Sequence, residues 1–258
     1  MPVLTDRAEI RARLERDRTW AAFSLADLDP PMLEHARWFG PVSGTGVVLV
    51  YGAYSPPIVV CHGDIDECDD ALGETEVRAH TQSAYLNMSP DQARVLLTHF
   101  PKFEQREMVR MVLNAAPDEA SLPSRPPVER LGLDDLEALR ALYAEEPPAF
   151  FLPLQLRNGV YYGVRDAGAI VAVAGTHVVS ETARVAALGN VHTRSDCRGR
   201  GLAASVTRAV CGELHARSIT TCVLNIVATN DVARRVYERV GFREYCRYAE
   251  GAAWRGEP

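Results

Sequence analysis

The residues whose types and spacing could do chemistry lie between Val191 and Phe242. Residues 197–201 read Cys-Arg-Gly-Arg-Gly, and apolar residues at helical spacing follow from Leu202 onward, so a helix is predicted to begin there. The start of a helix leaves backbone N–H groups without partners and carries the positive end of the helix dipole. Glycines let the backbone approach a ligand closely. Such a turn predicts an anion site, and a phosphate group is its natural occupant.

The elements that must position this turn follow from hydrophobic patterning. Ala186–His192 and Thr221–Val227 are apolar runs typical of buried strands, and the helix beginning at Leu202 lies between them. A second helix is predicted from Asn230 to Val240, with Asn230 as its cap. The segment is therefore a strand, a glycine-containing turn, a helix and a parallel strand, followed by a further helix.

Two common phosphate motifs do not fit this turn. The dinucleotide fingerprint needs three spaced glycines and an acidic residue about twenty positions later, which the chain lacks here. The P-loop ends in Gly-Lys-Ser/Thr, whereas the only lysine of the chain is Lys102.

Two motifs in this segment resemble those of the GNAT superfamily of acyl-CoA-dependent N-acyltransferases. The order Arg-x-x-Gly-x-Ala resembles the pyrophosphate-binding signature of that superfamily, and Asn-x-x-Ala-x-x-x-Tyr-x-x-x-Gly-Phe resembles its next motif. The residues at the marked positions are Arg198, Gly201, Ala203, Asn230, Ala233, Tyr237, Gly241 and Phe242. The resemblance covers about Val128 to Trp254. More faintly, the whole chain is similar to glycine N-acyltransferase relatives with a degenerate N-terminal GNAT domain.

The resemblance implies a site for acetyl-CoA, or coenzyme A, as co-substrate. Backbone amides of the turn would bind the pyrophosphate, two arginines would add positive charge, and backbone groups at the end of the preceding strand would pair with pantetheine. One of those strand amides would polarise the thioester carbonyl. The residues implied at this site are Val191, His192, Thr193, Arg198, Gly199, Arg200, Gly201, Leu202, Ala203, Ala204, Asn225, Asn230, Ala233 and Tyr237.

Tyr237 is the candidate catalytic residue. Positions 230, 233 and 237 lie on one helix face. The resemblance implies that Tyr237 is the general acid that protonates the departing thiolate, and the alternative is a core tyrosine that packs the helix against the sheet. The base stays open between His192, His177, a carboxylate and a water chain. Asn225 lies in an apolar strand and needs a partner, either the cofactor or a neighbouring backbone group.

Other chemistry-bearing residues are given structural interpretations. Cys61–Cys68 contains His and Asp residues but lacks the ligand spacing of zinc or calcium sites, so no metal is predicted and a solvated acidic loop is expected. Arg106 and Arg110 are expected to be surface charges.

Bulk composition excludes several classes. The chain has 258 residues and a net charge of −6 without a basic block, which disfavours nucleic-acid binding. No apolar run approaches the roughly 18 residues of a membrane span, and the N-terminus is not that of a secretory signal. Cys211 and Cys222 fall on predicted buried faces and are expected to be reduced, so a cytoplasmic location is predicted.

We predict an α/β chain with a mixed sheet and the GNAT acyl-CoA N-acyltransferase fold in its C-terminal half. Residues 1–116 form a smaller degenerate GNAT-like domain, the Pro-rich residues 117–127 a linker, and residues 128–258 the GNAT domain. Because the first half keeps no phosphate turn, one cofactor site per chain is expected. The other predicted elements are helices Asp6–Arg16, Ser89–His99 and Leu133–Ala144, and strands Val47–Tyr51, Ile58–Cys61, Phe103–Leu113, Val160–Arg165, Ala169–Val179 and Phe242–Tyr248.

The function predicted from these observations is N-acetyl transfer from acetyl-CoA to a primary amine, by direct transfer in a ternary complex. The acceptor would be a small-molecule or peptide amine, and a homodimer is possible. One alternative is a CoA-binding sensor or scaffold without catalysis. A second is a structural or partner-binding protein in which the turn is vestigial.

Overall fold

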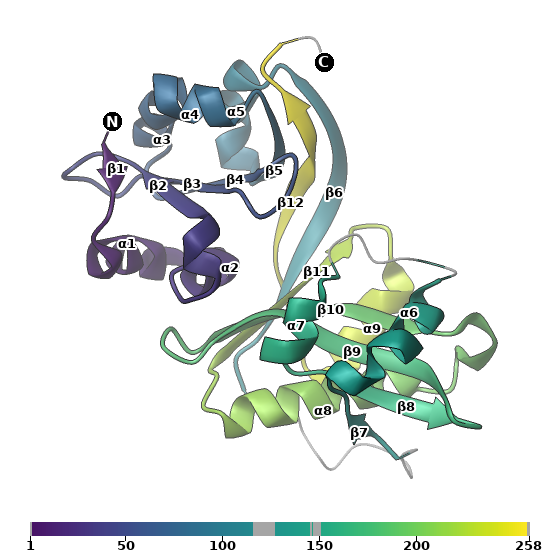
Figure 1. The fold of residues 1–258 in the computed structure, drawn as a ribbon. Helices are drawn as coiled ribbons and strands as arrows, with labels where there is room; N and C mark the ends of the chain where they lie inside the picture. The colour runs from purple at the N-terminus through teal and green to yellow at the C-terminus, as the bar shows by residue number, and fades with distance from the viewer. Residues whose placement is uncertain (1, 116–126, 145, 147–150, 257–258) are drawn as a thin grey trace. The chain divides into compact units, whose positions relative to one another are not determined.

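Two structural units make up the chain (Figure 1). The computed structural model describes residues 2–115, 127–144, 146 and 151–256. Unit 1 contains Met1–Arg110 and Cys246–Pro258, and unit 2 contains Met111–Tyr245. Strands β6 (Lys102–Leu113) and β12 (Arg243–Trp254) each contribute residues to both units. The predicted linker lies outside the described residues, except for Pro127.

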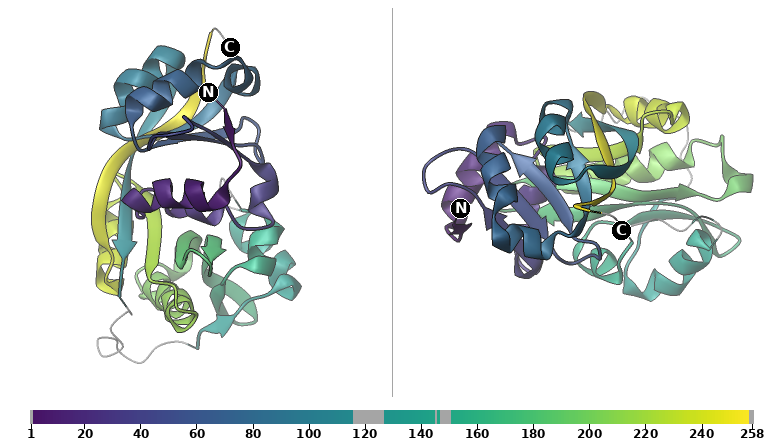
Figure 2. Two further views of the ribbon diagram at one scale, coloured as in Figure 1. Left: turned by 90° about the vertical axis from the view of Figure 1, so that its left-hand side faces the viewer. Right: turned by 90° about the horizontal axis from the view of Figure 1, so that it is seen from above.

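Unit 1 is a mixed sheet with helices on both faces. Its strand order is β1-β2-β3-β4-β5-β12; β4 and β5 are parallel, and the other pairs are antiparallel. Helices α3, α4 and α5 cover one face, and α1 and α2 cover the other (Figure 2). The elements are β1 Val3–Leu4, α1 Arg7–Leu14, α2 Ala22–Ala26, β2 Ala36–Phe39, β3 Val47–Tyr51, β4 Ile58–His62, α3 Ile65–Gly73, α4 Thr75–His80, β5 Ser83–Met88 and α5 Ala93–His99.

Unit 2 has the same layered plan. Its strand order is β11-β10-β9-β8-β7, in which β10 and β11 are parallel and the other pairs are antiparallel. Helices α6 and α7 cover one face of the sheet, and α8 and α9 cover the other (Figure 1). The elements are β7 Glu129–Arg130, α6 Leu136–Tyr143, α7 Pro153–Asn158, β8 Tyr162–Asp166, β9 Ala169–Ser180, β10 Val185–Thr193, α8 Leu202–Ala216, β11 Thr221–Val227 and α9 Asp231–Val240.

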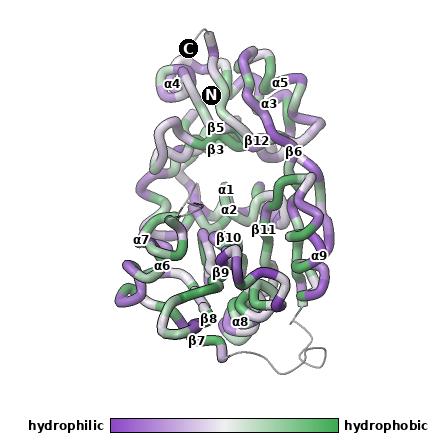
Figure 3. The backbone as a smooth tube through the Cα atoms, turned by 90° about the vertical axis from the view of Figure 1, so that its right-hand side faces the viewer, coloured by the Kyte–Doolittle hydropathy of each residue, from purple (hydrophilic) through white to green (hydrophobic). Residues whose placement is uncertain are grey.

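In both units the core forms where apolar strands pack against the helices that cover the sheet. The runs of β3 and β11 are drawn in green, the hydrophobic end of the scale, in Figure 3. In unit 1, Leu72 and Leu96 from two helices pack with Val48 and Leu86 of the sheet. In unit 2, the α6 and α7 face has its own cluster, which consists of Leu131, Leu139, Leu142, Tyr143, Leu156, Tyr161, Ile170 and Val173. Strands buried on both faces read as continuous apolar runs, which is why they could be located well from the sequence.

The structure confirms most predicted elements and corrects others. The mixed sheet, the strands at β3 and β4, the strand Thr221–Val227 and the capped helix α9 are as predicted. The prediction of a solvated loop for the acidic segment was wrong from Ile65 onward, where helix α3 begins. Asp64 caps this helix by accepting hydrogen bonds from the N–H groups of Asp66 and Glu67. At the C-terminus, β12 pairs with β5, and the residues of β12 from Cys246 onward belong to unit 1.

Arg110 was also predicted wrongly. Its side chain is buried rather than exposed, and its guanidinium lies over the rings of Trp20 at 4.6 Å and Tyr248 at 5.4 Å. Delocalised charge and a planar shape allow arginine to stack on aromatic rings in this way. No pattern in the sequence would place those rings around it.

Candidate functional site

The parallel strands β10 and β11 separate toward their carboxyl ends. In the described part of the chain their register pairs Val185–Ala187 with Thr221–Val223, and no pairing continues past this stretch. Both strands nevertheless run on, β10 to Thr193 and β11 to Val227. The last part of β10 therefore has an edge that β11 does not pair with.

A bulge in β10 directs backbone groups to that edge. The register with β9 shifts between Gly189 and His192, and Asn190 between them has a φ of 54°, in the left-handed region. His192 lies opposite Val173, and the N–H of Arg194 donates to the Val171 carbonyl at 2.9 Å. Because alternate residues of a strand hydrogen-bond to opposite sides, the backbone groups of residues 191 and 193 face away from β9.

The glycine-containing turn that follows β10 is open to solvent. Gly199 and Gly201 have φ values of 79° and 77°, which glycine adopts without strain. A Cβ atom built on either residue would have no described heavy atom within 4 Å. The turn therefore has space on its outer side for a ligand.

Helix α8 begins at this turn without a side-chain cap. Gly201 occupies the N-cap position, no side-chain hydrogen bond caps this helix end, and its first turn contains no acidic residue. The first helical hydrogen bond of this turn runs from the Ser205 N–H to the Gly201 carbonyl at 3.1 Å. The N–H groups of residues 202–204 and the positive end of the helix dipole thus stay available to an anion. Leu202 and Ala204 are buried and Ala203 is half-buried, so their side chains secure the helix while their amides face the turn.

The two arginines of the turn are exposed and already paired with carboxylates. Arg198 donates to the Thr193 carbonyl at 3.0 Å and to Glu146 Oε2 at 3.1 Å, and Arg200 lies 3.6 Å from Asp166 Oδ2. Exposed ion pairs of this kind contribute only about 0–1 kcal/mol. Both arginines can therefore exchange a carboxylate for a diphosphate at little cost.

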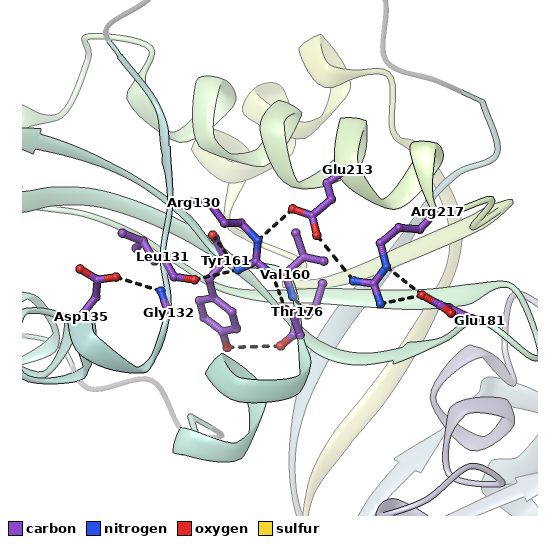
Figure 4. Close-up of polar contacts among 11 residues, drawn as sticks. Arg130, Leu131, Gly132, Asp135, Val160, Tyr161, Thr176, Glu181, Glu213 and Arg217 are labelled. Atoms are coloured by element: carbon purple, nitrogen blue, oxygen red, sulfur yellow. Dashed lines mark hydrogen bonds and ion pairs between the residues drawn. The ribbon is translucent and has the colours of Figure 1, made fainter.

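The opposite end of α8 is fixed by a chain of polar contacts (Figure 4). Arg130 donates to Glu213 at 2.8 Å and to the Gly159 carbonyl at 2.7 Å. Arg217 lies 3.6 Å from Glu213 and 2.8 Å from Glu181. The carboxyl-terminal half of α8 is thus tied to strands and loops of unit 2, whereas its amino-terminal end remains open.

Helix α9 is closed at both ends by its own residues. Asn230 accepts a hydrogen bond from the Ala233 N–H at 3.0 Å, which confirms the predicted cap. Gly241 has a φ of 110°, and the N–H of Phe242 donates to the Tyr237 carbonyl at 3.0 Å. A glycine in this conformation is the usual way to end a helix. Asn230 is exposed and Ala233 is half-buried, as is Asn225 on β11.

Tyr237 is buried on α9, with 8% of its surface exposed. Burial raises the pKa of Tyr237 far above its usual value, and the Cys211 thiol on α8 raises that pKa further. The ring packs edge-on against Phe242, with the centroids 6.0 Å apart. Tyr237 therefore stays a protonated hydrogen-bond donor at any physiological pH. Cys211 and Cys222 are buried free thiols, as predicted.

The two histidines considered as bases differ in their surroundings. His177 is half-buried with its Nδ1 3.3 Å from Gln155 Nε2, and loss of contact with water lowers the pKa of His177 to about 4. His192 is half-buried at the end of β10, with its Nδ1 4.0 Å from Glu146 and its ring edge-on to Tyr143. Of the two, only His192 lies beside the strand end and the turn.

Several residues around the bulge were missed by the sequence analysis. Tyr143, Gln155 and Tyr161 converge on Asn190 from α6, α7 and the position just before β8. They are far apart in the sequence, and only the sheet brings them together. The one usable signal was an asparagine within an apolar strand, because asparagine tolerates left-handed backbone better than most residues.

Comparison with known proteins connects this geometry to one fold. Residues 161–250, about a third of the chain, match the family model described as FR47-like protein. A GNAT-family acetyltransferase structure from Novosphingobium aromaticivorans is 22% identical, covers 93% of this chain and all of its own, and gives a TM-score of 0.63. A GCN5-related N-acetyltransferase from Kribbella flavida is 19% identical, with coverages of 98% and 97% and a TM-score of 0.64.

A third structure bears on the two units. The tandem GNAT protein from the clavulanic acid biosynthesis pathway is 14% identical, covers 99% of this chain and 98% of its own, and gives a TM-score of 0.62. No curated protein matches the sequence. These similarities show that the chain has the GNAT fold, arranged as two domains, as the sequence motifs predicted.

None of the helices in the described ranges combines the length and hydrophobicity that a bilayer crossing requires.

Proposed function

We propose that this protein is an acyltransferase that moves an acyl group from acyl-CoA to an amine, with acetyl-CoA and a primary amine as the specific pair. The observation that carries the proposal is the uncapped start of α8 beside the separated ends of β10 and β11. An anion-binding helix end and an open strand edge are what a long molecule with a diphosphate and an amide-containing arm requires.

The chemistry of the turn fits coenzyme A. The amides from Gly199 to Ala204 would hold the diphosphate, with charge supplied by Arg198 and Arg200, and the free space beside both glycines admits it. The first turn of α8 contains no carboxylate, so the side chains of the helix start itself do not repel a dianion. Asn225, Asn230 and Ala233 are proposed to line the path of the pantetheine arm.

The end of β10 would orient the reactive thioester. Val191 and Thr193, on either side of His192, would offer backbone groups at the edge that β11 leaves unpaired, in the manner of an added strand. The N–H of Val191 is our candidate for polarising the thioester carbonyl, since donors aimed at developing negative charge stabilise the transition state.

Tyr237 would act as the general acid. Its raised pKa keeps the phenol protonated, so it can donate to the departing sulfur. A phenol is a weaker acid than a thiol in water, so the transfer depends on the site: a thiolate released away from water is a stronger base than one in water, because burial raises the pKa of a thiol. Direct transfer needs no nucleophile from the protein, so the chain's own groups would only bind, orient and move protons. An acyl-CoA substrate also fits the predicted cytoplasmic location.

Calorimetric titration with CoA, followed by thiol release from acetyl-CoA with a panel of amines, tests this proposal. Binding together with amine-dependent thiol release supports an acyltransferase. Binding without release would favour the sensor or scaffold function. The absence of both binding and release would contradict the proposal.

A further inference from the structure

The bulge of β10 is held by side chains from two helices. The Tyr143 hydroxyl, at the end of α6, donates to the Asn190 carbonyl at 2.7 Å. The Asn190 side-chain amide donates to Gln155 Oε1 at 3.0 Å and to the Tyr161 hydroxyl at 2.8 Å. The left-handed backbone at Asn190 is thus fixed on both its main chain and its side chain.

These contacts leave little freedom in the orientation of the polar groups. Gln155 Oε1 also accepts from the Leu152 N–H at 3.1 Å, so its Nε2 is the group that faces His177. Tyr143, Gln155 and Asn190 are all more than nine-tenths buried. Burial raises the pKa of Tyr143 far above its usual value, with a further rise from the neighbouring Tyr161, so the hydroxyl remains a donor. A buried and satisfied polar network of this kind specifies one arrangement.

Fixing the Asn190 carbonyl also fixes the next N–H. The peptide bond between Asn190 and Val191 is trans, because the cis bonds within the described residues are those before Pro31 and Pro56. In a planar trans peptide the N–H points opposite to the C=O. The carbonyl accepts from Tyr143 of α6, so the Val191 N–H, on the opposite side of the peptide plane, points away from Tyr143.

We propose that Tyr143 is a positioning residue of the acyl-transfer site, which holds the Asn190 carbonyl so that the Val191 N–H is aimed at the thioester carbonyl. This inference rests on the proposed function. Tyr143 itself touches no reacting atom, and it acts through the peptide plane of the bulge. Without its hydroxyl the plane can rotate, and the donor loses its direction while the diphosphate turn stays intact.

The test compares Tyr143→Phe with Tyr162→Phe. Tyr162 lies on β8, which is separated from β10 by β9, so its variant is a matched loss of one hydroxyl in the same unit. Steady-state kinetics give kcat and the KM for acetyl-CoA. Amide NMR of labelled protein follows the Val191 resonance on addition of CoA or acetyl-CoA, and thermal unfolding reports whether the variant is folded.

We expect Tyr143→Phe to lower kcat about tenfold with KM within about twofold, since loosening a donor costs less than the roughly hundredfold or greater loss from removing one. In the parent protein the Val191 resonance should respond differently to acetyl-CoA and to CoA, and that difference should be lost in the variant but kept in Tyr162→Phe. An unchanged kcat, or a Val191 resonance that distinguishes the two ligands equally well in both variants, overturns the inference. If the parent transfers no acyl group, the proposed function fails while the Val191 response to the two ligands still decides the role of Tyr143.

Discussion

Both units contain the same backbone motif, a strand that leads through a turn into a helix and on to a parallel neighbour. In unit 1 the strands are β4 and β5 with α3 after the turn, and in unit 2 they are β10 and β11 with α8. Each turn has a glycine of positive φ, Gly63 in unit 1 and Gly201 in unit 2. The two motifs differ in what surrounds that glycine.

The turn of unit 1 is filled by the protein itself. A Cβ at Gly63 would lie 2.0 Å from the Thr45 carbonyl oxygen, and Asp64 caps the first amides of α3. Glu67 in the first turn of α3 accepts from the N–H groups of Thr45 and Gly46 at 2.8 and 2.6 Å. Carboxylates therefore already occupy the place where an anion could bind.

The turn of unit 2 has no such occupant among the described residues. Gly201 has open space beside it, the first turn of α8 has no acidic side chain, and Arg198 and Arg200 flank it. A helix start can be completed by the chain's own carboxylate or by a ligand's phosphate, because both satisfy the same amides and the same dipole. This contrast is the physical reason to expect one CoA site per chain, in unit 2.

The largest expected effect is on turnover. Unit 2 carries Tyr237 on the helix after its parallel pair, whereas α5, which follows the parallel pair of unit 1, contains no tyrosine. We predict that Tyr237→Phe lowers kcat about a hundredfold, the low end of what a general acid contributes, with CoA affinity within about twofold. Kinetics and calorimetry measure the two quantities, and an unchanged kcat would remove Tyr237 from the mechanism.

The second prediction closes the open turn. Gly201→Val places a branched side chain at a φ of 77° and fills the space beside the turn. Strain of about 1–3 kcal/mol and the blocked approach should weaken CoA binding about thirtyfold. Gly212→Ala, in the same helix and also with open space, is the matched control and should leave affinity unchanged. If Gly201→Val binds CoA as tightly as the parent does, the site lies elsewhere.

The turn, its helix and the Asn230 cap could be located from the sequence because those features depend on near neighbours in the chain. The cap at Asp64 was missed, although an N-cap residue followed three positions later by Glu67 is a recognisable helix-start pattern. Tyr143 and Gln155 could not be placed at the bulge, since strand pairing and helix packing bring them to Asn190. The burial of Arg110 depends on aromatic rings from distant segments.

A third prediction compares two histidines, one in each unit, whose pKa values are lowered in the folded protein. Burial lowers the pKa of His177 to about 4, and burial together with the Arg110 charge lowers the pKa of His62 to about 3, so both are neutral when folded. Unfolding restores a pKa near 6.5, and the unfolded chain then binds more protons. Stability should be full above about pH 6.5 and fall as the pH decreases toward 4, by up to about 1.4 kcal/mol per pH unit for each histidine.

Urea unfolding at several pH values measures this slope. In His177→Gln, the part of the pH dependence that comes from His177 should disappear. A flat profile between about pH 6.5 and 4.5 would mean that the histidines are charged in the folded protein.

The smallest expected effect is in unit 1. Asp64→Ala removes the cap of α3 and should lower the free energy of unfolding by about 1 kcal/mol. CoA stoichiometry should not change, because Glu67 and the Thr45 carbonyl still fill the turn. A second CoA site in this variant would show that the Asp64 cap alone keeps the turn of unit 1 from binding CoA.

Calorimetric titration of the parent protein with CoA tests the central contrast most directly. If CoA binds only at the uncapped helix end of unit 2, the titration should give one CoA per chain, and the affinity should be lower in Gly201→Val. Two equivalent CoA molecules per chain, or no binding, would contradict it.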